Sequence, residues 1–495
     1  MSELANIEET TICACSTGNC SGAVAVVRMS GPDTFDILSK VFKPKRDVDL
    51  KTLPGYTLLY GDVFKHDGTL LDDVLVSIFK APHSYTGEDS AEISCHGSNY
   101  IVKELLSMLT DNGAKYAAGG DFTKRAFLNG KMDLAQAEAV CDLISSETEA
   151  SHDVAMQQMR GGFSKELEAM RTNLLQIVSL LELELDFSDE DVQFADRKEL
   201  QKLLDDSCSQ INSLISSFKL GNAIKSGVPV AIVGATNTGK STLLNALLRE
   251  DRAIVSSIAG TTRDTIEDVI NLNGVLFRFI DTAGIRATLE AIEKMGIERT
   301  YYKIRQASVV LMMLDSTNPD GFAESIDNLS KRINSSEQTL FILINKCDQK
   351  SILPASEKDK TDVYSSESDA PSVDDLVEKV RVMAADAGLT PTAILPISAR
   401  QRLGLDVLES MLVESQNSLR ASGDMVLVSN MRHYTALKDA YNALLRANVA
   451  LGEHVPTDLV AQDIRESLYS IGTIVGAVST DEILGNIFKN FCIGK

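Results

Sequence analysis

The stretch Gly234-Ala-Thr-Asn-Thr-Gly239-Lys240-Ser241 decides the fold of the central part of this 495-residue chain. An apolar run, 228–233, precedes it and a helical pattern, 241–249, follows it, which is the strand–loop–helix context of a phosphate-binding loop. The backbone N–H groups of such a loop and the N-terminus of its helix bind phosphate oxygens. We expect Lys240 to reach the β- and γ-phosphates and the Ser241 hydroxyl to hold Mg²⁺.

Two further motifs follow in the order that a guanine-nucleotide switch needs. Asp281-Thr-Ala-Gly284 comes after an apolar run, and it predicts a turn at the γ-phosphate in which Asp281 holds Mg²⁺ through water. Asn345-Lys346-Cys347-Asp348 follows a second apolar run. The Asp348 carboxylate can accept from both N–H groups on the Watson–Crick edge of guanine, whereas adenine would offer a mismatched acceptor. The three motifs together predict GTP binding.

Other segments supply the remaining expected nucleotide contacts. Thr261 and Thr262 are candidates for the switch that closes over Mg²⁺, and Ser398-Ala399 should approach guanine O6. The predicted Mg²⁺ ligands are Ser241 and Thr262. The full predicted nucleotide-binding set is Asn237, Thr238, Gly239, Lys240, Ser241, Thr242, Ser256, Ser257, Ile258, Ala259, Gly260, Thr261, Thr262, Asp281, Thr282, Ala283, Gly284, Asn345, Lys346, Asp348, Ser398, Ala399 and Arg400.

One position departs from many switch GTPases. Where those proteins carry a Gln that orients water, this chain has Ile285. An apolar side chain cannot orient the nucleophile, and no obvious Arg of this chain supplies a cation for the phosphate charge. The sequence therefore predicts that another side chain and another cation complete the catalytic site.

Composition limits the partners of the chain. A net charge of −22 argues against non-specific coating of nucleic acid, because phosphate neutralisation needs clustered Lys and Arg. An RNA substrate would have to meet a local basic patch or be held by a partner. No run approaches the apolar length of a membrane span and the start is acidic, so we expect a cytoplasmic protein without a membrane. Cys13, Cys15 and Cys20 lack a second ligand set with zinc spacing, which favours reduced thiols.

The periodicity of the sequence changes along the chain. Residues 23–131 mix short strands and helices, whereas helical spacing dominates from 133 to 218 and again after 424. Between them, strand candidates at 228–233, 274–280, 308–314, 340–344 and 393–397 alternate with helices, which predicts a parallel, doubly wound sheet. Gly221 and Gly227 are expected to end the helix that begins at Arg197. Each helical flank has one apolar face to cover, so we predict that the flanks pack together around an inserted sheet domain.

A polar insertion, 349–390, interrupts the sheet segment. We expect a surface excursion of which one part, Val373–Ala385, is helical and the rest is disordered.

The whole chain resembles the MnmE (TrmE) family of tRNA-modification GTPases. The matching motifs are Tyr85-Thr-Gly-Glu-Asp89, Arg125-Ala-Phe-Leu-Asn-Gly-Lys-Met-Asp-Leu-Ala-Gln-Ala-Glu138, Asp281-Thr-Ala-Gly-Ile-Arg286 with Gly296-Ile-Glu-Arg299, and Phe491-Cys-Ile-Gly-Lys495. The resemblance implies an α/β P-loop GTPase domain inserted in an α-helical domain, preceded by an N-terminal α+β folate-binding domain. The implied bounds are 1–131 for the folate-binding and dimerisation domain, 132–225 and 417–495 for the helical domain, and 226–416 for the GTPase.

The resemblance also implies a reaction and partners. Family members form homodimers and act with an FAD protein of the MnmG (GidA) type, as a heterotetramer, on the wobble uridine (position 34) of certain tRNAs. Together they add a carboxymethylaminomethyl or aminomethyl group to C5 of that uridine. The carbon comes from a tetrahydrofolate, in its 5-formyl or 5,10-methylene form.

Catalytic residues follow from the same resemblance. Glu293 stands twelve residues after Asp281, where the family has a Glu that orients water. The implied catalytic residues are Glu293, Lys240 and Cys492. For Cys492, a nucleophilic or redox role and a buried position at a helix end remain equal alternatives.

The family also implies two further ligand sets. It uses K⁺ in place of an arginine finger, with the GTPase domains of two subunits pairing across the nucleotides. The implied K⁺ ligands are Asn237, Ser256, Ile258 and Thr261, and Ser256 replaces the commoner Thr. The implied folate contacts are Arg28, Glu92, Lys131 and Lys495. A carboxylate such as Glu92 can bind the amino-pyrimidinone edge of a pterin, and cations attract its glutamyl tail.

Two departures and two alternatives stay open. The early loop Cys15–Gly22 differs from the family's Pro-Gly-rich loop, so its folate contacts are not carried over, and the insertion after Asp348 is longer than usual. The chain could instead be a regulator whose two nucleotide states gate the assembly of a complex, or a structural dimer that scaffolds the flavoprotein. For His433, near a helix start, a core or capping role is favoured over catalysis.

Overall fold

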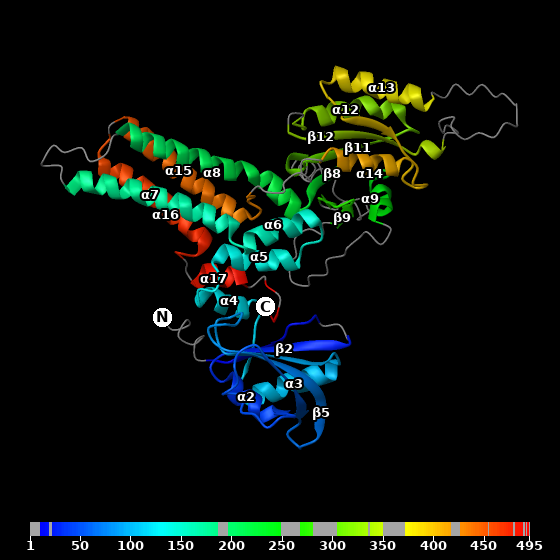
Figure 1. Cartoon of the computed structure of the whole chain (residues 1–495). Coiled ribbons are helices and arrows are strands. Elements are labelled where there is room, and N and C mark those ends of the chain that lie inside the picture. Colours follow the sequence, from blue (N-terminus) through cyan, green and yellow to red (C-terminus); the bar gives the residue numbers. More distant parts are fainter. Residues whose placement is uncertain are drawn as a thin grey trace. The chain divides into compact units, whose positions relative to one another are not determined.

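The computed structural model describes residues 10–18, 22–186, 197–248, 268–280, 304–334, 337–349, 372–416, 426–453, 455–478, 481–488, 491, 493 and 494. The chain forms two compact units (Figure 1). One unit takes Met1–Ser145, Ala155–Ile215 and Arg432–Lys495, and the other takes Ser146–Val154 and Ser216–Met431. Within the described ranges, no helix combines the length and the apolar character needed to cross a bilayer.

The N-terminal part of the first unit is built on a seven-stranded sheet. Its strand order is β3 (Phe42–Pro44), β4 (Thr57–Phe64), β5 (Leu70–Phe79), β6 (Ser90–His96), β2 (Val24–Ser30), β1 (Ile12–Cys15) and β7 (Lys115–Tyr116). Neighbours are antiparallel except β1 and β7. Helices α2 (Thr34–Val41) and α3 (Asn99–Asp111) cover one face, where Val27, Val76 and Ile93 are buried. The mixed strand and helix pattern of this segment is confirmed.

The other face of this sheet is largely open. Because side chains alternate along a strand, the residues next to the buried ones point to this second face. The cross-strand register puts Tyr60 opposite Leu75 and Glu92 opposite Arg28. Tyr60, Leu75 and Leu58 are all exposed, Leu58 to 62%. A charged pair therefore shares this face with exposed apolar side chains.

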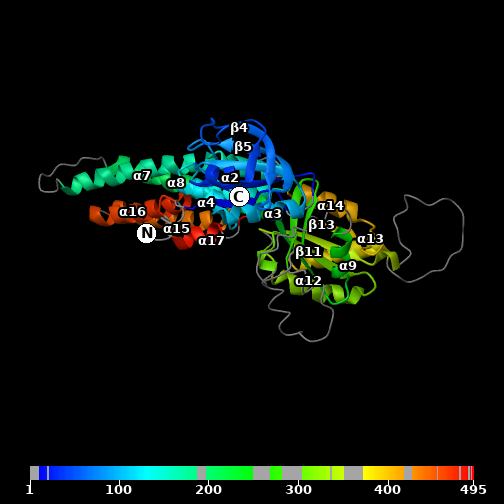
Figure 2. The same cartoon turned by 90° about the horizontal axis from the view of Figure 1, so that it is seen from below.

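The helical part of the first unit comes from both sides of the inserted segment. Its helices are α4 (Asp121–Leu128), α5 (Leu134–Ile144), α7 (Gly162–Asp186), α15 (Met431–Gly452), α16 (Thr457–Val475) and α17 (Asp481–Phe488). Two further helices, α6 (Glu149–Met159) and α8 (Arg197–Ser226), belong partly to this unit and partly to the other. The long helices α7, α8, α15 and α16 run side by side (Figures 1 and 2). Asn448 of α15 donates to Asp205 of α8, and Arg465 of α16 pairs with Glu182 of α7. The prediction that the two flanks pack together is confirmed.

One helix end was predicted wrongly. Gly221 does not end α8, which continues to Ser226 and stops at Gly227, where φ is +85°. The reason is a close approach between segments, because a Cβ on Gly221 would lie 2.4 Å from the Val428 carbonyl oxygen. Gly221 is therefore a packing residue within a helix rather than a stop signal.

The second unit contains a six-stranded sheet. Its order is β13 (Ala393–Pro396), β12 (Thr339–Asn345), β11 (Val309–Asp315), β8 (Val228–Gly234), β10 (Val275–Phe279) and β9 (Asp268–Leu272). Helices α9 (Lys240–Leu248) and α14 (Leu405–Glu414) pack on one face, and α12 (Phe322–Ser330) and α13 (Val373–Asp386) pack on the other. The doubly wound fold and the helical part of the polar insertion are confirmed; residues 350–371 of that insertion lie outside the described residues.

The edge strand β9 was not predicted, and it makes the sheet mixed rather than wholly parallel. It pairs with β10 in antiparallel register through the turn Asn273-Gly274. Both turn residues have positive φ, +49° and +87°. Such an Asn-Gly turn matches the twist of a two-stranded hairpin, so the signal for β9 was present in the sequence.

Candidate functional site

The loop between β8 and α9 has the backbone of a phosphate-binding loop. Asn237 adopts a left-handed conformation at φ +62°, and Gly239 has φ +100°. A Cβ at Gly239 would lie 2.3 Å from Nδ2 of Asn345, so only glycine fits. The exposed loop residues 235–237 leave their surface open to a ligand at the N-terminus of α9, where Ser241 and Thr242 begin the helix.

Asn345, at the end of β12, fastens three predicted binding segments to one another. Its Nδ2 donates to the Thr238 carbonyl at 2.8 Å, and its Oδ1 accepts from the Ala399 amide at 3.0 Å. The side chain is 3% exposed, so both bonds are protected from water. The phosphate loop and the two predicted base-binding segments thus share one buried amide.

The predicted guanine contacts also lie together. Ser398 donates from Oγ to Oδ1 of Asp348 at 2.6 Å, and Ser398 is itself 1% exposed. A further hydrogen bond, from the Gln401 amide to Ser398 Oγ, holds the hydroxyl from its other side. The Asp348 carboxylate is therefore oriented before any base arrives. Arg400 is exposed next to this cluster.

Two lysines of the motifs have defined partners. Lys240 donates from Nζ to the carbonyl oxygens of Gly234 and Ala235, at 2.9 and 2.6 Å, so its ammonium lies against the loop. Lys346, at φ +65°, pairs through Nζ with Oδ2 of Asp315 at 2.6 Å. Sequence reasoning missed Asp315, which has no motif around it.

Several predicted nucleotide-site and tail residues lie outside the described residues. These are Ser256, Ser257, Ile258, Ala259, Gly260, Thr261, Thr262, Asp281, Thr282, Ala283, Gly284, Glu293, Cys492 and Lys495. Their roles stay predictions.

A second cluster surrounds Arg28 in the N-terminal sheet. Arg28 donates from Nε and Nη2 to Oε1 of Glu92, at 2.9 and 2.8 Å. The guanidinium carbon lies over two aromatic rings, 5.2 Å from the Tyr85 centroid and 5.6 Å from that of Phe122. Cation–π contacts and the ion pair together fix this cation in place. The two rings were not predicted, although Tyr85 stands in a quoted motif.

The C-terminal tail reaches the same cluster. Ile493 forms an antiparallel bridge with Gly119, and the Gly494 carbonyl accepts from Arg28 Nη1 at 3.4 Å and from Ser16 Oγ at 3.1 Å. Gly494 has φ +89°, and a Cβ there would lie 2.5 Å from the Cys15 carbonyl oxygen. The predicted folate contact Arg28 therefore borders Gly494, a position where a side chain would clash with the Cys15 backbone.

Lys131 is brought to the loop that carries Tyr85. Its Nζ donates to the Pro82 carbonyl at 2.9 Å. Asn129, two residues earlier, donates from Nδ2 to the Thr86 carbonyl at 2.7 Å. The turn 129–131 and the loop 81–89 are thus held together by side-chain bonds.

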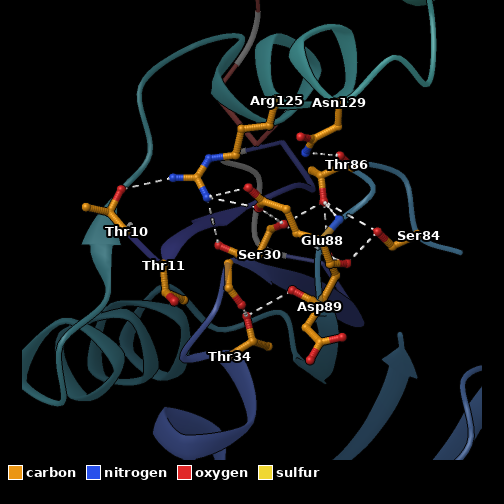
Figure 3. Close-up of polar contacts among 12 residues, drawn as sticks. Thr10, Thr11, Ser30, Thr34, Ser84, Thr86, Glu88, Asp89, Arg125 and Asn129 are labelled. Atoms are coloured by element: carbon orange, nitrogen blue, oxygen red, sulfur yellow. Dashed lines mark hydrogen bonds and ion pairs between the residues drawn. The ribbon is translucent and has the colours of Figure 1, made fainter. Parts of the chain in front are cut away.

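A buried polar network supports this loop from behind (Figure 3). Arg125 of α4, only 3% exposed, donates from Nη1 to both oxygens of Glu88, at 3.1 and 2.9 Å. Ser30 Oγ donates to Glu88 Oε2 at 2.7 Å, and Arg125 Nη2 donates to Thr10 Oγ1 at 3.1 Å. The remaining hydroxyls of the network are those of Ser84, Thr86, Ser90 and Thr34. Every charge in it has a partner, as a buried network requires.

Burial disfavours ionisation of two thiols in the N-terminal sheet. Burial raises the pKa of Cys13 to about 12 and that of Cys95 to about 11. Among the described residues there is no group of three or more His, Cys, Asp or Glu side chains that could hold a metal ion. Cys15 is free as well, and Cys20 lies outside the described residues.

His433 has the core role that the sequence favoured. It is 1% exposed, its Nε2 lies 2.6 Å from Oε2 of Glu138, and its ring packs against Phe163 at 5.2 Å.

Comparisons with known proteins cover nearly the whole chain. The family described as MnmE helical domain matches residues 134–492, and the family described as GTP-binding protein TrmE N-terminus matches residues 11–131. Proteins named tRNA modification GTPase MnmE are 47% identical in Bacteroides thetaiotaomicron and 46% identical in Flavobacterium johnsoniae, each over 99% of this chain and 100% of the relative. The same-named protein of Parabacteroides distasonis is 46% identical over 98% of this chain and 100% of its own.

One solved structure with a related sequence overlaps the chain only in part. The crystal structure of Era in complex with MgGDPNP and nucleotides 1506–1542 of 16S ribosomal RNA covers 44% of this chain and 66% of that chain, at 26% identity and a TM-score of 0.27. The assignment of the chain to a family therefore rests on the relatives that match it over nearly its whole length.

Proposed function

The chain belongs to the MnmE family of tRNA modification GTPases, and on that premise we propose that it hydrolyses GTP while modifying the wobble uridine of tRNA. The observation that carries the nucleotide part is the shared amide of Asn345, which joins the phosphate loop at Thr238 to the predicted base-binding segment at Ala399. A site preorganised in this way binds its ligand without first ordering loose segments. Asp348, already oriented by Ser398, accepts from the guanine N–H donors.

For hydrolysis we assign three roles to side chains of this chain. Lys240 moves from its loop carbonyls onto the β- and γ-phosphates and offsets the charge that develops there. Glu293 orients the water that attacks the γ-phosphorus, while the bond to the departing GDP breaks. Ser241, at the first turn of α9, and Thr262 would hold Mg²⁺, which would supply positive charge beside the phosphates.

A monovalent cation completes this proposal. The ligands assigned to K⁺, which are Asn237, Ser256, Ile258 and Thr261, offer amide, hydroxyl and carbonyl oxygens, as a hard cation prefers. The described member, Asn237, lies in an exposed left-handed turn of the phosphate loop, which fits a ligand on the phosphate side. The ion would supply the positive charge that the absence of an obvious Arg leaves unprovided.

The Arg28 cluster is our candidate for a tetrahydrofolate site, in its 5-formyl or 5,10-methylene form. The Glu92 carboxylate suits a pterin edge, and Tyr85 and Phe122 offer ring surfaces at the same place. Lys131 and Lys495 would attract the glutamyl tail. Cys492 is retained as a candidate catalytic thiol, because its neighbour Ile493 bridges Gly119 near this cluster.

The open face of the N-terminal sheet supports a homodimer. Val24, Leu58 and Tyr60 are each more than half exposed on it. Exposed apolar patches of this kind mark protein interfaces. A second copy of the chain would cover them, and an FAD protein of the MnmG type would complete a heterotetramer on tRNA in the cytoplasm. We propose 1–131, 132–225 with 417–495, and 226–416 as the bounds of the three domains.

Three measurements test this function. GTP hydrolysis by the purified full chain should be fast in K⁺ and slow in Na⁺ at equal ionic strength, and Glu293→Ala should lower kcat by about 10² or more. Equal rates in the two salts would remove the potassium site. In cells that lack the protein, mass spectrometry of tRNA should find unmodified uridine at position 34. Normal modification at position 34 would instead favour a regulator whose two nucleotide states gate the assembly of a complex.

A further inference from the structure

We propose that Asp315 is a positioning residue of the nucleotide site, which acts by holding Lys346 against the place of the purine ring. The inference rests on the nucleotide site proposed above and deepens it. It predicts that Asp315 sets the affinity for purine nucleotides without reading which purine is bound.

The sheet brings the two residues together. Asp315 ends β11 and Asn345 ends β12, and the parallel register places these two residues opposite each other. Lys346 follows Asn345 directly, at the carboxyl edge of the sheet where ligands of such folds bind. Its Nζ lies 2.6 Å from Asp315 Oδ2, and the two side chains are 27% and 17% exposed.

Asp315 is itself held in one orientation. Its Oδ1 accepts from the Thr317 amide at 2.9 Å and from Thr317 Oγ1 at 2.6 Å. This leaves Oδ2 for Lys346. Burial raises the pKa of Asp315, but the hydrogen bonds from Lys346 and Thr317 outweigh burial and keep that pKa below its usual range. The carboxylate is therefore charged at neutral pH.

Lys346 lies between the two residues that are already engaged in the site. Asn345 is bonded to Thr238 and Ala399, and Asp348 is bonded to Ser398. With its ammonium tied to Asp315, Lys346 has only its methylene stem to offer, and such stems cover apolar surfaces. The flat face of a purine is a surface of that kind. The backbone of Lys346 lies in the left-handed region, at φ +65°, which costs free energy for a residue that has a side chain.

The consequence separates Asp315 from Asp348. Loss of a contact to the ring face weakens guanine and hypoxanthine nucleotides by the same factor, because both present the same face. Loss of the Asp348 contact changes the preference between them, since hypoxanthine lacks the exocyclic amino group that guanine donates.

The test measures the dissociation constants of fluorescent GDP and IDP for the full chain. Asp315→Asn should weaken both by the same factor, about tenfold, and should raise KM for GTP while kcat at saturation changes less than about twofold. Thr317→Val, which removes one bond to Asp315, should move both constants in the same direction by about two- to threefold. Asp327→Asn is the matched control, because it breaks an exposed pair with Lys331 in the same unit and should change neither constant.

A double-variant cycle shows whether Asp315 acts through Lys346. In a Lys346→Met background, Asp315→Asn should add less than about a twofold loss. An equal loss in both backgrounds, or unchanged constants in Asp315→Asn alone, overturns the inference while the nucleotide site stands. If the wild-type chain binds neither nucleotide, the nucleotide site itself fails, and this inference fails with it.

Discussion

His433 Nε2 and Glu138 Oε2 lie 2.6 Å apart in the helical part of the chain, although 295 positions separate them. Arg432 donates from Nε and Nη2 to the two oxygens of the same carboxylate, both at 2.9 Å. It also donates to the carbonyls of Thr473 and Ile474 at the end of α16. One buried carboxylate therefore joins α5, α15 and α16. It links residues from both sides of the inserted segment.

Removing the negative charge of Glu138 should lower the free energy of unfolding of the helical part. Glu138→Gln keeps the shape but leaves two donors with a neutral partner, and breaking a buried pair in this way costs about 3–5 kcal/mol. Hydrogen exchange of α5 and α15 should speed up accordingly. Glu378→Gln, which breaks an exposed pair with Arg381, is the control and should change little. Unaltered exchange in Glu138→Gln would show that the carboxylate is not a fastening point.

The same carboxylate predicts a dependence on pH. Burial alone raises the pKa of Glu138, but the hydrogen bonds and charges of His433 and Arg432 outweigh burial and lower that pKa to about 2. The unfolded chain then binds this proton more readily than the folded chain, so stability rises with pH. The free energy of unfolding should fall as the pH decreases from the ordinary carboxyl value of 4.5 toward about 2. Urea titrations at stepped pH should show a shallower decline in Glu138→Gln, and equal slopes would contradict this account.

The network behind the Tyr85 loop predicts a non-additive pair of variants (Figure 3). Arg125→Met leaves the Glu88 carboxylate without its cationic partner. The free energy of unfolding of the first unit should fall by about 3–5 kcal/mol. Adding Glu88→Gln should recover part of this loss, because the stranded charge is gone. Chemical denaturation of the single and double variants measures both values. If the loss of unfolding free energy in the double variant equals the sum of the losses in Arg125→Met and Glu88→Gln, the two groups act independently.

Tyr85 should matter for folate through its ring. Tyr85→Leu removes the aromatic surface over Arg28 and should weaken binding of 5-formyltetrahydrofolate about tenfold, or about 1.4 kcal/mol. Tyr85→Phe keeps the ring and loses only the hydroxyl contact with Thr123, so it should bind within about twofold of wild type. Isothermal titration calorimetry separates the two. Equal losses in both variants would assign the effect to the hydroxyl.

Gly239 should tolerate no side chain. Gly239→Ala adds a Cβ that would overlap Asn345, and it should weaken GTP binding at least tenfold. Gly274→Ala is the matched control, since Gly274 has a similar positive φ of +87° but nothing within 4 Å of its Cβ. We expect it to cost about 1 kcal/mol of stability and no affinity. Normal GTP binding by Gly239→Ala would show that the loop can move away from Asn345.

The sequence was most informative where function demands a local pattern. The strand before Gly234 and the apolar run before Asn345 lie within a few residues of where they were predicted, because strand periodicity and motif context agree there. The end of α8 was missed for a different reason. What Gly221 does is decided by Val428, more than two hundred positions later, and no local pattern carries that information.

The candidate sites show the same limit. The sequence motifs predicted Asp348 and Ser398, but not Asp315, whose partner Lys346 directly follows the neighbouring strand β12. Likewise, the contact of Arg28 with the two rings depends on strand register and on the packing of α4. A side chain that acts by positioning a neighbouring residue does not belong to a recognisable sequence motif.

The bond between Arg28 and Gly494 has a consequence for how the molecule matures on the ribosome. These residues are 466 positions apart, so at about 5–20 residues per second translation separates them by roughly 25–90 s. During that interval the Arg28 guanidinium lacks the Gly494 carbonyl that accepts its Nη1 hydrogen bond. A nascent chain that stalls in the GTPase segment would therefore present the Arg28 cluster, our proposed folate site, without the Gly494 carbonyl.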